Sequence, residues 1–174
     1  MTGPLLTRGE IEDLITALGE RCDARGIHVE MFLVGGAAMA LAYSRERTTR
    51  DLDAIFEPKQ LVYEQARRLA DERGLPPDWL NDGVKALVSD QLEPQVIFAS
   101  TGISVVVASP DYLFAMKAAA ARQEADTEDL LTLAAILHID TASAAFAMIE
   151  RFYEPSRLSA KSQFFIQGAF ADGG

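Results

Sequence analysis

The stretch from His28 to Phe56 constrains the fold of this chain more than any other segment. His28 to Val34 is rich in β-branched and large apolar residues, which predicts a strand, and it runs directly into Gly35-Gly36. A short helix of small residues is expected over Ala37 to Tyr43, and Leu52 to Phe56 again has the composition of a strand. The chain is therefore expected to place a helix between two strands, with a glycine pair at the first turn.

Strand and helix signals continue on both sides of this stretch. Thr7 and Glu10 match a capping box that opens an amphipathic helix ending before Gly26. Lys59 to Arg73 returns to helical spacing, and two later strands joined through Thr101-Gly102 are expected to form a hairpin. The predicted hairpin strands are Gln95 to Ala99 and Ile103 to Ala108.

The C-terminal third is predicted to be helical. Its helices are expected at Asp111 to about Arg122, Glu128 to His138, Ser143 to Tyr153 and Ser156 to about Gln167. The sequence thus indicates an α/β (α+β) protein with a helical C-terminal part. Residues 1–174 are expected to form a single domain, with a sheet-containing core over about 10–109 and a helical layer over about 110–170.

Composition and charge exclude several classes of protein. The longest apolar runs are much shorter than the roughly 20 residues that cross a bilayer, and no basic-then-apolar leader opens the chain, so a cytoplasmic protein without membrane partners is expected. The net charge of −10 argues against a broad, nonspecific grip on nucleic acid, although it allows a local basic patch. Cys22, the sole cysteine, falls on the apolar side of the first helix and is predicted to be a buried structural thiol.

Asp51 and Asp53 are the first candidate functional residues. Two carboxylates at positions i and i+2 of a strand project from one face, where their like charges repel unless a cation neutralises them. Mg²⁺ typically takes one or two carboxylates plus substrate phosphates, which makes this pair a candidate metal site. Alone, the pair would more often be two solvated acids at the start of an exposed strand.

Gly35 and Gly36 meet a second requirement of phosphate chemistry. Without side chains they let a phosphate approach the backbone, and the positive end of the following helix favours an anion. A glycine pair alone is equally typical of an ordinary strand-to-helix turn. The combination of the glycine pair with the two acids favours the functional interpretation.

This combination resembles the nucleotidyltransferase superfamily, whose shared pattern is a Gly-Gly or Gly-Ser turn, a short helix and an Asp-x-Asp strand. Val34-Gly35-Gly36 and Asp51-Leu52-Asp53 carry the resemblance. More narrowly, four segments are similar to the minimal nucleotidyltransferase-like proteins related to the AbiEii abortive-infection toxins, within a span of residues 10 to 140. They are Phe32 to Ala38, Arg47 to Asp53, Leu75 to Asp82 and Pro110 to Lys117.

The resemblance implies a mixed β-sheet flanked by helices and the transfer of a nucleotidyl group from a nucleoside triphosphate. Asp51 and Asp53 would be the ligands of Mg²⁺, with Mn²⁺ as a substitute. Many members of the superfamily add a third carboxylate from a later strand, whereas the two predicted hairpin strands contain no acid. This chain therefore departs from the three-acid pattern.

The resemblance also points to residues in the C-terminal helices. In the AbiEii-like proteins a lysine after the hairpin and a later aspartate line the site, and Lys117 and Asp126 or Asp129 match them. Lys117 would contact triphosphate oxygens, while the acid would orient Lys117 or assist proton removal from the acceptor. The alternative is a solvent-facing lysine and a solvated turn over Glu124 to Asp129.

Four arginines complete the candidate nucleotide-binding set. Arg45, Arg47 and Arg50 immediately precede the acids, where they would bind the triphosphate tail or an acceptor phosphate, or else lie on the surface. Arg122 follows Lys117 by five residues, which places it roughly on the same side of the predicted helix.

The remaining aromatic and polar signals have structural interpretations. Trp79 is predicted to be a core anchor and Asn81 to cap a turn. His28 and His138 belong to no group with metal-ligand spacing and are predicted to be structural.

Three functions stay open at this point. The first is a Mg²⁺-dependent nucleotidyltransferase that modifies RNA, such as tRNA, or protein, as a component of a toxin–antitoxin or phage-defence pair. The second is a catalytically silent nucleotide-binding or protein-interaction module, acting as an antitoxin or sensor. The third is a self-limited adenylylation of a cognate toxin.

Overall fold

The computed structural model describes residues 3–82, 93–120 and 123–171. They fall into two compact units, the first containing residues 3–82 and 93–108 and the second residues 109–120 and 123–171. The described strands all lie in the first unit and the second is helical, which confirms the predicted α/β class with a helical C-terminal part. The assignment of the whole chain to a single nucleotidyltransferase-like domain stays a prediction.

The described strands of the first unit form a mixed sheet in the order β3-β2-β1-β5-β4. Its central strand, β1, runs parallel to β5 and antiparallel to β2, while β2 pairs in parallel with β3 and β5 antiparallel with β4. The strands are β1 (Val29–Val34), β2 (Leu52–Glu57), β3 (Leu80–Asn81), β4 (Pro94–Ser100) and β5 (Ile103–Ala108). Because β1 pairs with both β2 and β5, the C-terminal ends of β1 and β5 lie beside the N-terminal end of β2.

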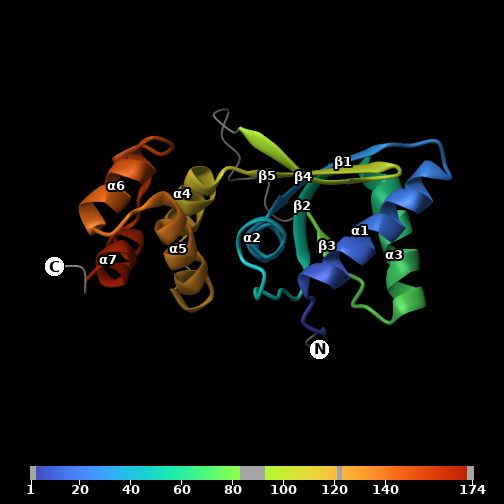
Figure 1. Cartoon of the computed structure of the whole chain (residues 1–174), viewed down its shortest axis with the longest axis horizontal. Coiled ribbons are helices and arrows are strands. Elements are labelled where there is room, and N and C mark those ends of the chain that lie inside the picture. Colours follow the sequence, from blue (N-terminus) through green and yellow to red (C-terminus); the bar gives the residue numbers. More distant parts are fainter. Residues whose placement is uncertain (1–2, 83–92, 121–122, 172–174) are drawn as a thin grey trace. The chain divides into compact units, whose positions relative to one another are not determined.

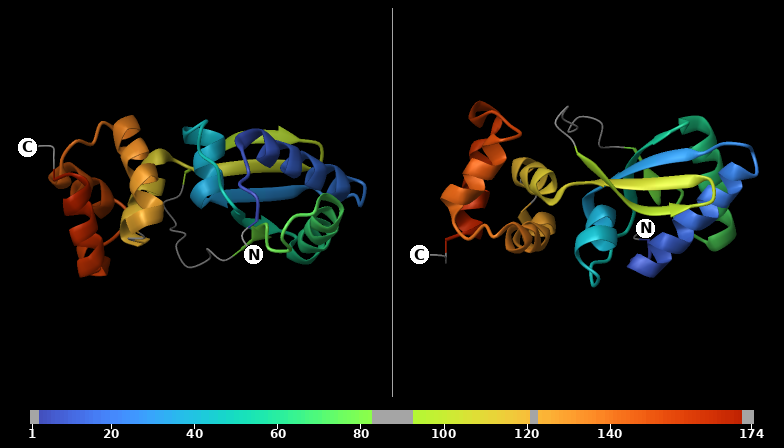
Figure 2. Two further views of the ribbon diagram at one scale, coloured as in Figure 1. Left: turned by 90° about the horizontal axis from the view of Figure 1, so that it is seen from below. Right: turned by 45° about the horizontal axis from the view of Figure 1, so that its top comes forward.

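Helices cover one face of this sheet (Figures 1 and 2). They are α1 (Arg8–Asp23), α2 (Gly35–Ala38), the π-helix η1 (Met39–Tyr43) and α3 (Lys59–Arg73). The strands turn alternate side chains toward these helices, so Met31 and Leu33 of β1 are fully buried. On the opposite face Phe32 is half-buried and Val96 is 67% exposed.

The helix boundaries follow from local capping chemistry. Thr7 and Glu10 form the predicted capping box, in which the Thr7 side chain accepts from the Glu10 N–H and the Glu10 carboxylate accepts from the Thr7 N–H at 2.8 Å. Helix α3 ends at Gly74, whose φ of 66° is left-handed and therefore suits glycine. The structure confirms the predicted spans of α1 and α3.

Two glycines let α1 pack closely on the turn between β4 and β5. A Cβ added to Gly102 would lie 2.2 Å from the carbonyl oxygen of Gly19 in α1, and one added to Gly19 would lie 2.5 Å from Cγ2 of Ile103. Such distances leave no room for a side chain at either position. Gly102 also has a φ of 75°, which a glycine adopts at no steric cost.

The second unit packs its helices around α4. These helices are α4 (Pro110–Ala120), α5 (Gln123–Leu137), α6 (Ala142–Glu150), the 3-10 turn η3 (Pro155–Arg157) and α7 (Ala160–Ala169). Tyr112 and Phe114 of α4 are fully buried, and the buried hydroxyl of Ser162 in α7 donates to the carbonyl oxygen of Ala119 at 2.9 Å. Helix α4 is therefore the core of this unit.

Some predicted boundaries were wrong. Helix α5 begins at Gln123, five residues before the predicted Glu128, so the alternative of a solvated turn over Glu124 to Asp129 is incorrect. The glycine pair is the first turn of α2 and does not precede it, and the short strand β3 was missed.

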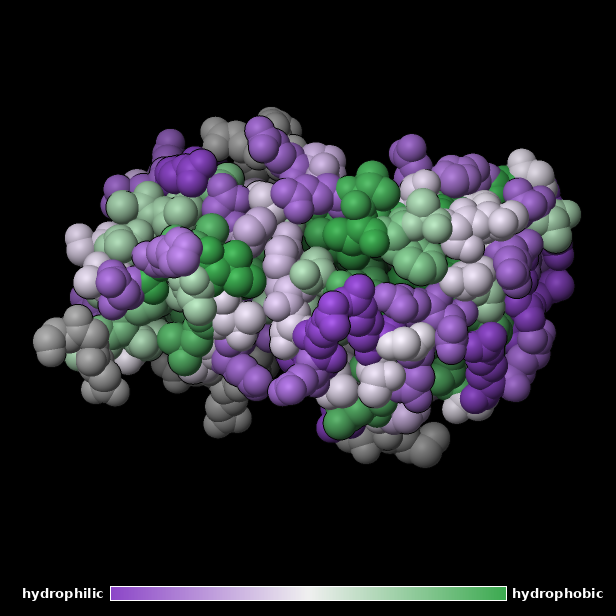
Figure 3. Space-filling model, viewed as in Figure 1, coloured by the Kyte–Doolittle hydropathy of each residue, from purple (hydrophilic) through white to green (hydrophobic). Residues whose placement is uncertain are grey.

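No single helix in the described ranges is long and apolar enough to cross a membrane; α5 and α6 pass that test of length and composition only together, as a pair bent by 87°. Hydrophobic patches are interspersed with hydrophilic residues on the face of the molecule drawn in Figure 3.

Candidate functional site

The glycine pair lies directly against the second acid of the Asp-x-Asp motif. Val34, the last residue of β1, pairs with Asp53 of β2, so the chain enters α2 beside this carboxylate. A Cβ added to Gly35 would lie 3.2 Å from Oδ2 of Asp53, and the φ of Gly35 is 63°. The backbone therefore approaches the carboxylate because Gly35 has no side chain and tolerates a left-handed conformation.

The two acids occupy different local structures. Asp53 is the second residue of β2, between the buried Leu52 and Ala54, so its side chain projects from the face opposite to theirs. Asp51 lies in a bend just before the strand, which corrects the prediction that both acids belong to it. Both residues are half-buried, a setting in which carboxylates reach solvent and ligands.

Thr49 fixes the approach to the acids. Its backbone forms a bridge with Leu6, and its hydroxyl donates to the carbonyl oxygen of Asp51 at 3.0 Å. A Cβ added to Gly36 would lie 2.7 Å from Oγ1 of this threonine. The second glycine of the pair thus makes room for Thr49, as the first does for Asp53.

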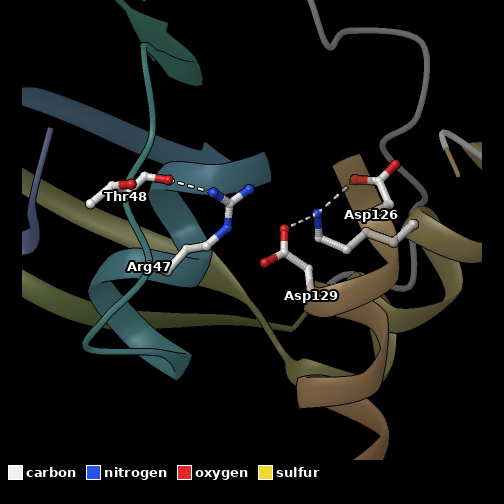
Figure 4. A network of polar contacts seen from close by, with 5 residues as sticks. Arg47, Thr48, Asp126 and Asp129 are labelled. Atoms are coloured by element: carbon white, nitrogen blue, oxygen red, sulfur yellow. Dashed lines mark hydrogen bonds and ion pairs between the residues drawn. The ribbon is translucent and has the colours of Figure 1, made fainter. Parts of the chain in front are cut away.

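Arg47 is the basic residue that the structure brings to the glycine pair. A Cβ on Gly36 would lie 3.6 Å from one terminal nitrogen of its guanidinium, and the other terminal nitrogen donates to the carbonyl oxygen of Thr48 (Figure 4). Arg50 is exposed and donates to the carbonyl oxygen of Gly3, while Arg45 is exposed in a turn. Of the three arginines before the acids, Arg47 has the geometry closest to the predicted role.

Asn81 is a neighbour of the acids that sequence reasoning did not place. It was predicted to cap a turn, whereas it forms half of β3, and its amide nitrogen donates to Oδ2 of Asp51 at 3.1 Å. The register of β3 also sets Asn81 opposite Asp53. The similarity of residues 75–82 to a family segment was a signal for this position, but it gave no contact partner.

A second group of predicted residues comes together within the helical unit. The ammonium of Lys117 in α4 donates to Asp126 at 3.1 Å and to Asp129 at 2.9 Å, both in α5 (Figure 4). Lys117 is 6% exposed and each aspartate 2%, so the alternative of a solvent-facing lysine is wrong. The sequence analysis left open whether Asp126 or Asp129 orients Lys117, and the structure shows that both accept from its ammonium. Arg122 lies outside the described residues.

The donor set around the glycine pair suits a hard divalent cation. Carboxylate and amide oxygens are ligands for Mg²⁺ and Ca²⁺, and Asp51, Asp53 and Asn81 supply both kinds. Within residues 3–82, 93–120 and 123–171, no three acidic, histidine or cysteine side chains group in a way that could hold a metal. Two carboxylates with a neutral amide are therefore what this site offers a metal ion.

In comparisons with known proteins, no family model, curated protein or solved structure matches this chain. Membership of the nucleotidyltransferase superfamily stays a prediction from the residues quoted above.

Proposed function

We propose that this protein is a divalent-metal-dependent nucleotidyltransferase whose metal ligands are Asp51 and Asp53. The observation that carries the proposal is the contact between the glycine pair and the Asp-x-Asp motif: Gly35 has no side chain where a Cβ would stand 3.2 Å from the Asp53 carboxylate. A phosphate beside this backbone would lie next to two metal-binding acids. An ordinary strand-to-helix turn does not require that juxtaposition.

The chain's own residues have distinct tasks in this proposal. Asp51 and Asp53 hold the cation, the backbone of Gly35-Gly36 accommodates the triphosphate, and the guanidinium of Arg47 neutralises phosphate charge. A bound Mg²⁺ or Mn²⁺ would supply charge neutralisation on the phosphate oxygens. Catalysis would then consist largely of positioning and electrostatic stabilisation.

The reaction joins an acceptor to the α-phosphate of the nucleotide. An acceptor hydroxyl oxygen bonds to the α-phosphorus, the bond from that phosphorus to the β-phosphate bridging oxygen breaks, and pyrophosphate leaves with the bond electrons. The hydroxyl proton passes to a base or to water. The resemblance alone assigns triphosphate contact and help in this proton transfer to Lys117, Asp126 and Asp129, whose ion pairs lie within the helical unit.

The acceptor in this proposal is an RNA such as tRNA or a protein, and the setting is a toxin–antitoxin or phage-defence pair. Mass spectrometry of a co-expressed partner would detect a transferred nucleotide, including adenylylation of a cognate toxin.

A catalytically silent nucleotide-binding or protein-interaction module on the same fold is the second candidate. The observation that favours it is the neutral side chain of Asn81, which donates to Asp51 and lies opposite Asp53, so that this neighbour of the two acids adds no third negative charge. Triphosphate binding that survives Asp53→Ala, without turnover of any acceptor, would identify this alternative.

Isothermal titration with each of the four nucleoside triphosphates in Mg²⁺ tests the proposal. We expect binding to the wild-type protein that is lost in Asp51→Ala/Asp53→Ala, while the melting temperature in EDTA stays the same or rises because close like charges are removed. Asp71→Asn, which removes an exposed acid of α3, is the matched control and should bind as the wild type does. A double variant that binds normally would refute the assignment.

A further inference from the structure

Asn81 faces both acids of the proposed site from a neighbouring strand. Its amide nitrogen donates to Oδ2 of Asp51 at 3.1 Å, and parallel pairing of β3 with β2 sets it opposite Asp53. Residues directly opposite each other in a sheet project from the same face. One amide therefore accompanies both carboxylates.

The fold anchors Asn81 from both sides. On one side the buried indole of Trp79 donates to the carbonyl oxygen of Ala66 in α3 at 3.0 Å. On the other side the carboxylate of Asp82 accepts from the hydroxyl of Tyr63 at 2.7 Å and pairs with Lys59, both in α3. Two attachments to one helix thus hold the short strand β3 in register with β2.

The charge of the group beside the two acids affects how strongly they would attract a free cation. With a neutral amide, the site carries the charge of two carboxylates, and the amide N–H satisfies one lone pair of Asp51 when no metal is present. A third carboxylate would repel the other two in that state, and it would attract a free cation more strongly, since affinity rises with the number of charged ligands. The phosphates of a nucleotide can supply the missing negative charge.

We propose that Asn81 is a positioning residue that orients Asp51 and, because it is neutral, makes the site select the metal–nucleoside triphosphate complex over the free metal ion. This inference rests on the proposed function, since it assigns Asp51 and Asp53 as the metal ligands. Because Asn81 adds no third negative charge beside Asp51 and Asp53, metal binding would depend on the charge that the nucleotide brings.

Mn²⁺ binding, followed by the electron paramagnetic resonance signal of the free ion, tests the inference with and without a non-hydrolysable nucleoside triphosphate. The wild-type protein should bind Mn²⁺ with the nucleotide at least about tenfold more tightly than Mn²⁺ alone. Asn81→Asp should bind free Mn²⁺ about tenfold more tightly than the wild type, and its melting temperature should fall in EDTA and recover on adding Mn²⁺. Asn81→Ala should weaken binding of the Mn²⁺–nucleotide complex by about tenfold, as loss of a partner that orients a metal ligand commonly does.

Asn81 is the sole asparagine of the chain, so selective ¹⁵N-asparagine labelling gives a single side-chain NH₂ pair in the NMR spectrum. Mn²⁺ with nucleotide should broaden this signal in the wild type and leave it sharp in Asp53→Ala.

The outcomes of these experiments separate the proposed function from the role of Asn81. A wild-type protein that binds no Mn²⁺–nucleotide overturns both the proposed function and this inference. A wild type that binds the complex, with Asn81→Asp and Asn81→Ala unchanged from it in Mn²⁺ binding and in melting temperature, overturns the role of Asn81 alone.

Discussion

At the scale of single residues, Gly35 offers the sharpest test of the candidate site. Gly35→Ala strains a left-handed backbone and places a methyl group 3.2 Å from the Asp53 carboxylate, so we expect both a loss of about 1 kcal/mol of stability and the loss of metal-dependent nucleotide binding. Gly26→Ala is the matched control, because Gly26 has a φ of 71° with no atom near the added Cβ. It should lose similar stability and keep nucleotide binding. Equal binding by the two variants would contradict the site.

Replacing Lys117 should cost the helical unit a large part of its stability. Lys117→Met removes the ammonium from two buried carboxylates, and breaking a buried charge network in this way costs about 3 kcal/mol. Urea denaturation measures the loss. Combining Lys117→Met with Asp126→Asn and Asp129→Asn should restore part of it, since two buried negative charges are then removed as well. A triple variant no more stable than Lys117→Met would show that packing, and not charge, explains the loss.

At the scale of elements, the capping box of α1 gives a pH dependence. Hydrogen bonds from the backbone N–H and then the hydroxyl of Thr7 hold the pKa of Glu10 below its ordinary value of 4.5. A lowered pKa in the folded state means that the stabilisation is fully present above pH 4.5 and is lost as the pH falls through the lowered value. Thermal unfolding should therefore separate the wild type from Glu10→Gln at pH 7, with a gap that shrinks as the pH falls below 4.5. A constant gap across this range would contradict the assignment.

Long elements were predictable from the sequence because their signals are local. The capping box, the helical spacing of α3 and the β-branched run of β5 each lie within one element, and the structure confirms them. β3 has only two residues, too few to show alternation, and it exists because β2 offers a partner and Trp79 is anchored on α3. Tertiary pairing of this kind leaves no periodic pattern in the sequence.

The same reasoning explains which site residues were found. The glycine pair and the two acids flank one helix-containing connection, so their proximity follows from pairing two successive strands. The contact of Asn81 with Asp51 depends on the non-local pairing of β3 and was missed. The burial of Lys117 could not be predicted from the sequence either, because it depends on how α5 packs against α4. Helix α5 also begins five residues earlier than expected.

At the scale of the whole molecule, charge limits how an acceptor can be held. A net charge of −10 gives little nonspecific attraction for a nucleic acid, so an RNA acceptor would depend on local basic residues such as Arg45 and Arg47. A protein acceptor has no such requirement. Binding of an RNA acceptor through basic residues should therefore weaken as the salt concentration rises, whereas binding of a protein acceptor need not.

The close packing of Gly19 on Gly102 also has a consequence for how the chain is made. These glycines are 83 positions apart, so the helix that contains Gly19 leaves the ribosome long before the turn that covers it. At translation rates of about 5–20 residues per second, the delay is roughly 4–17 s. During that time α1 can pack against η1 and α3 but not against β4 and β5, and the part of its apolar side that the hairpin later covers stays open to chaperones.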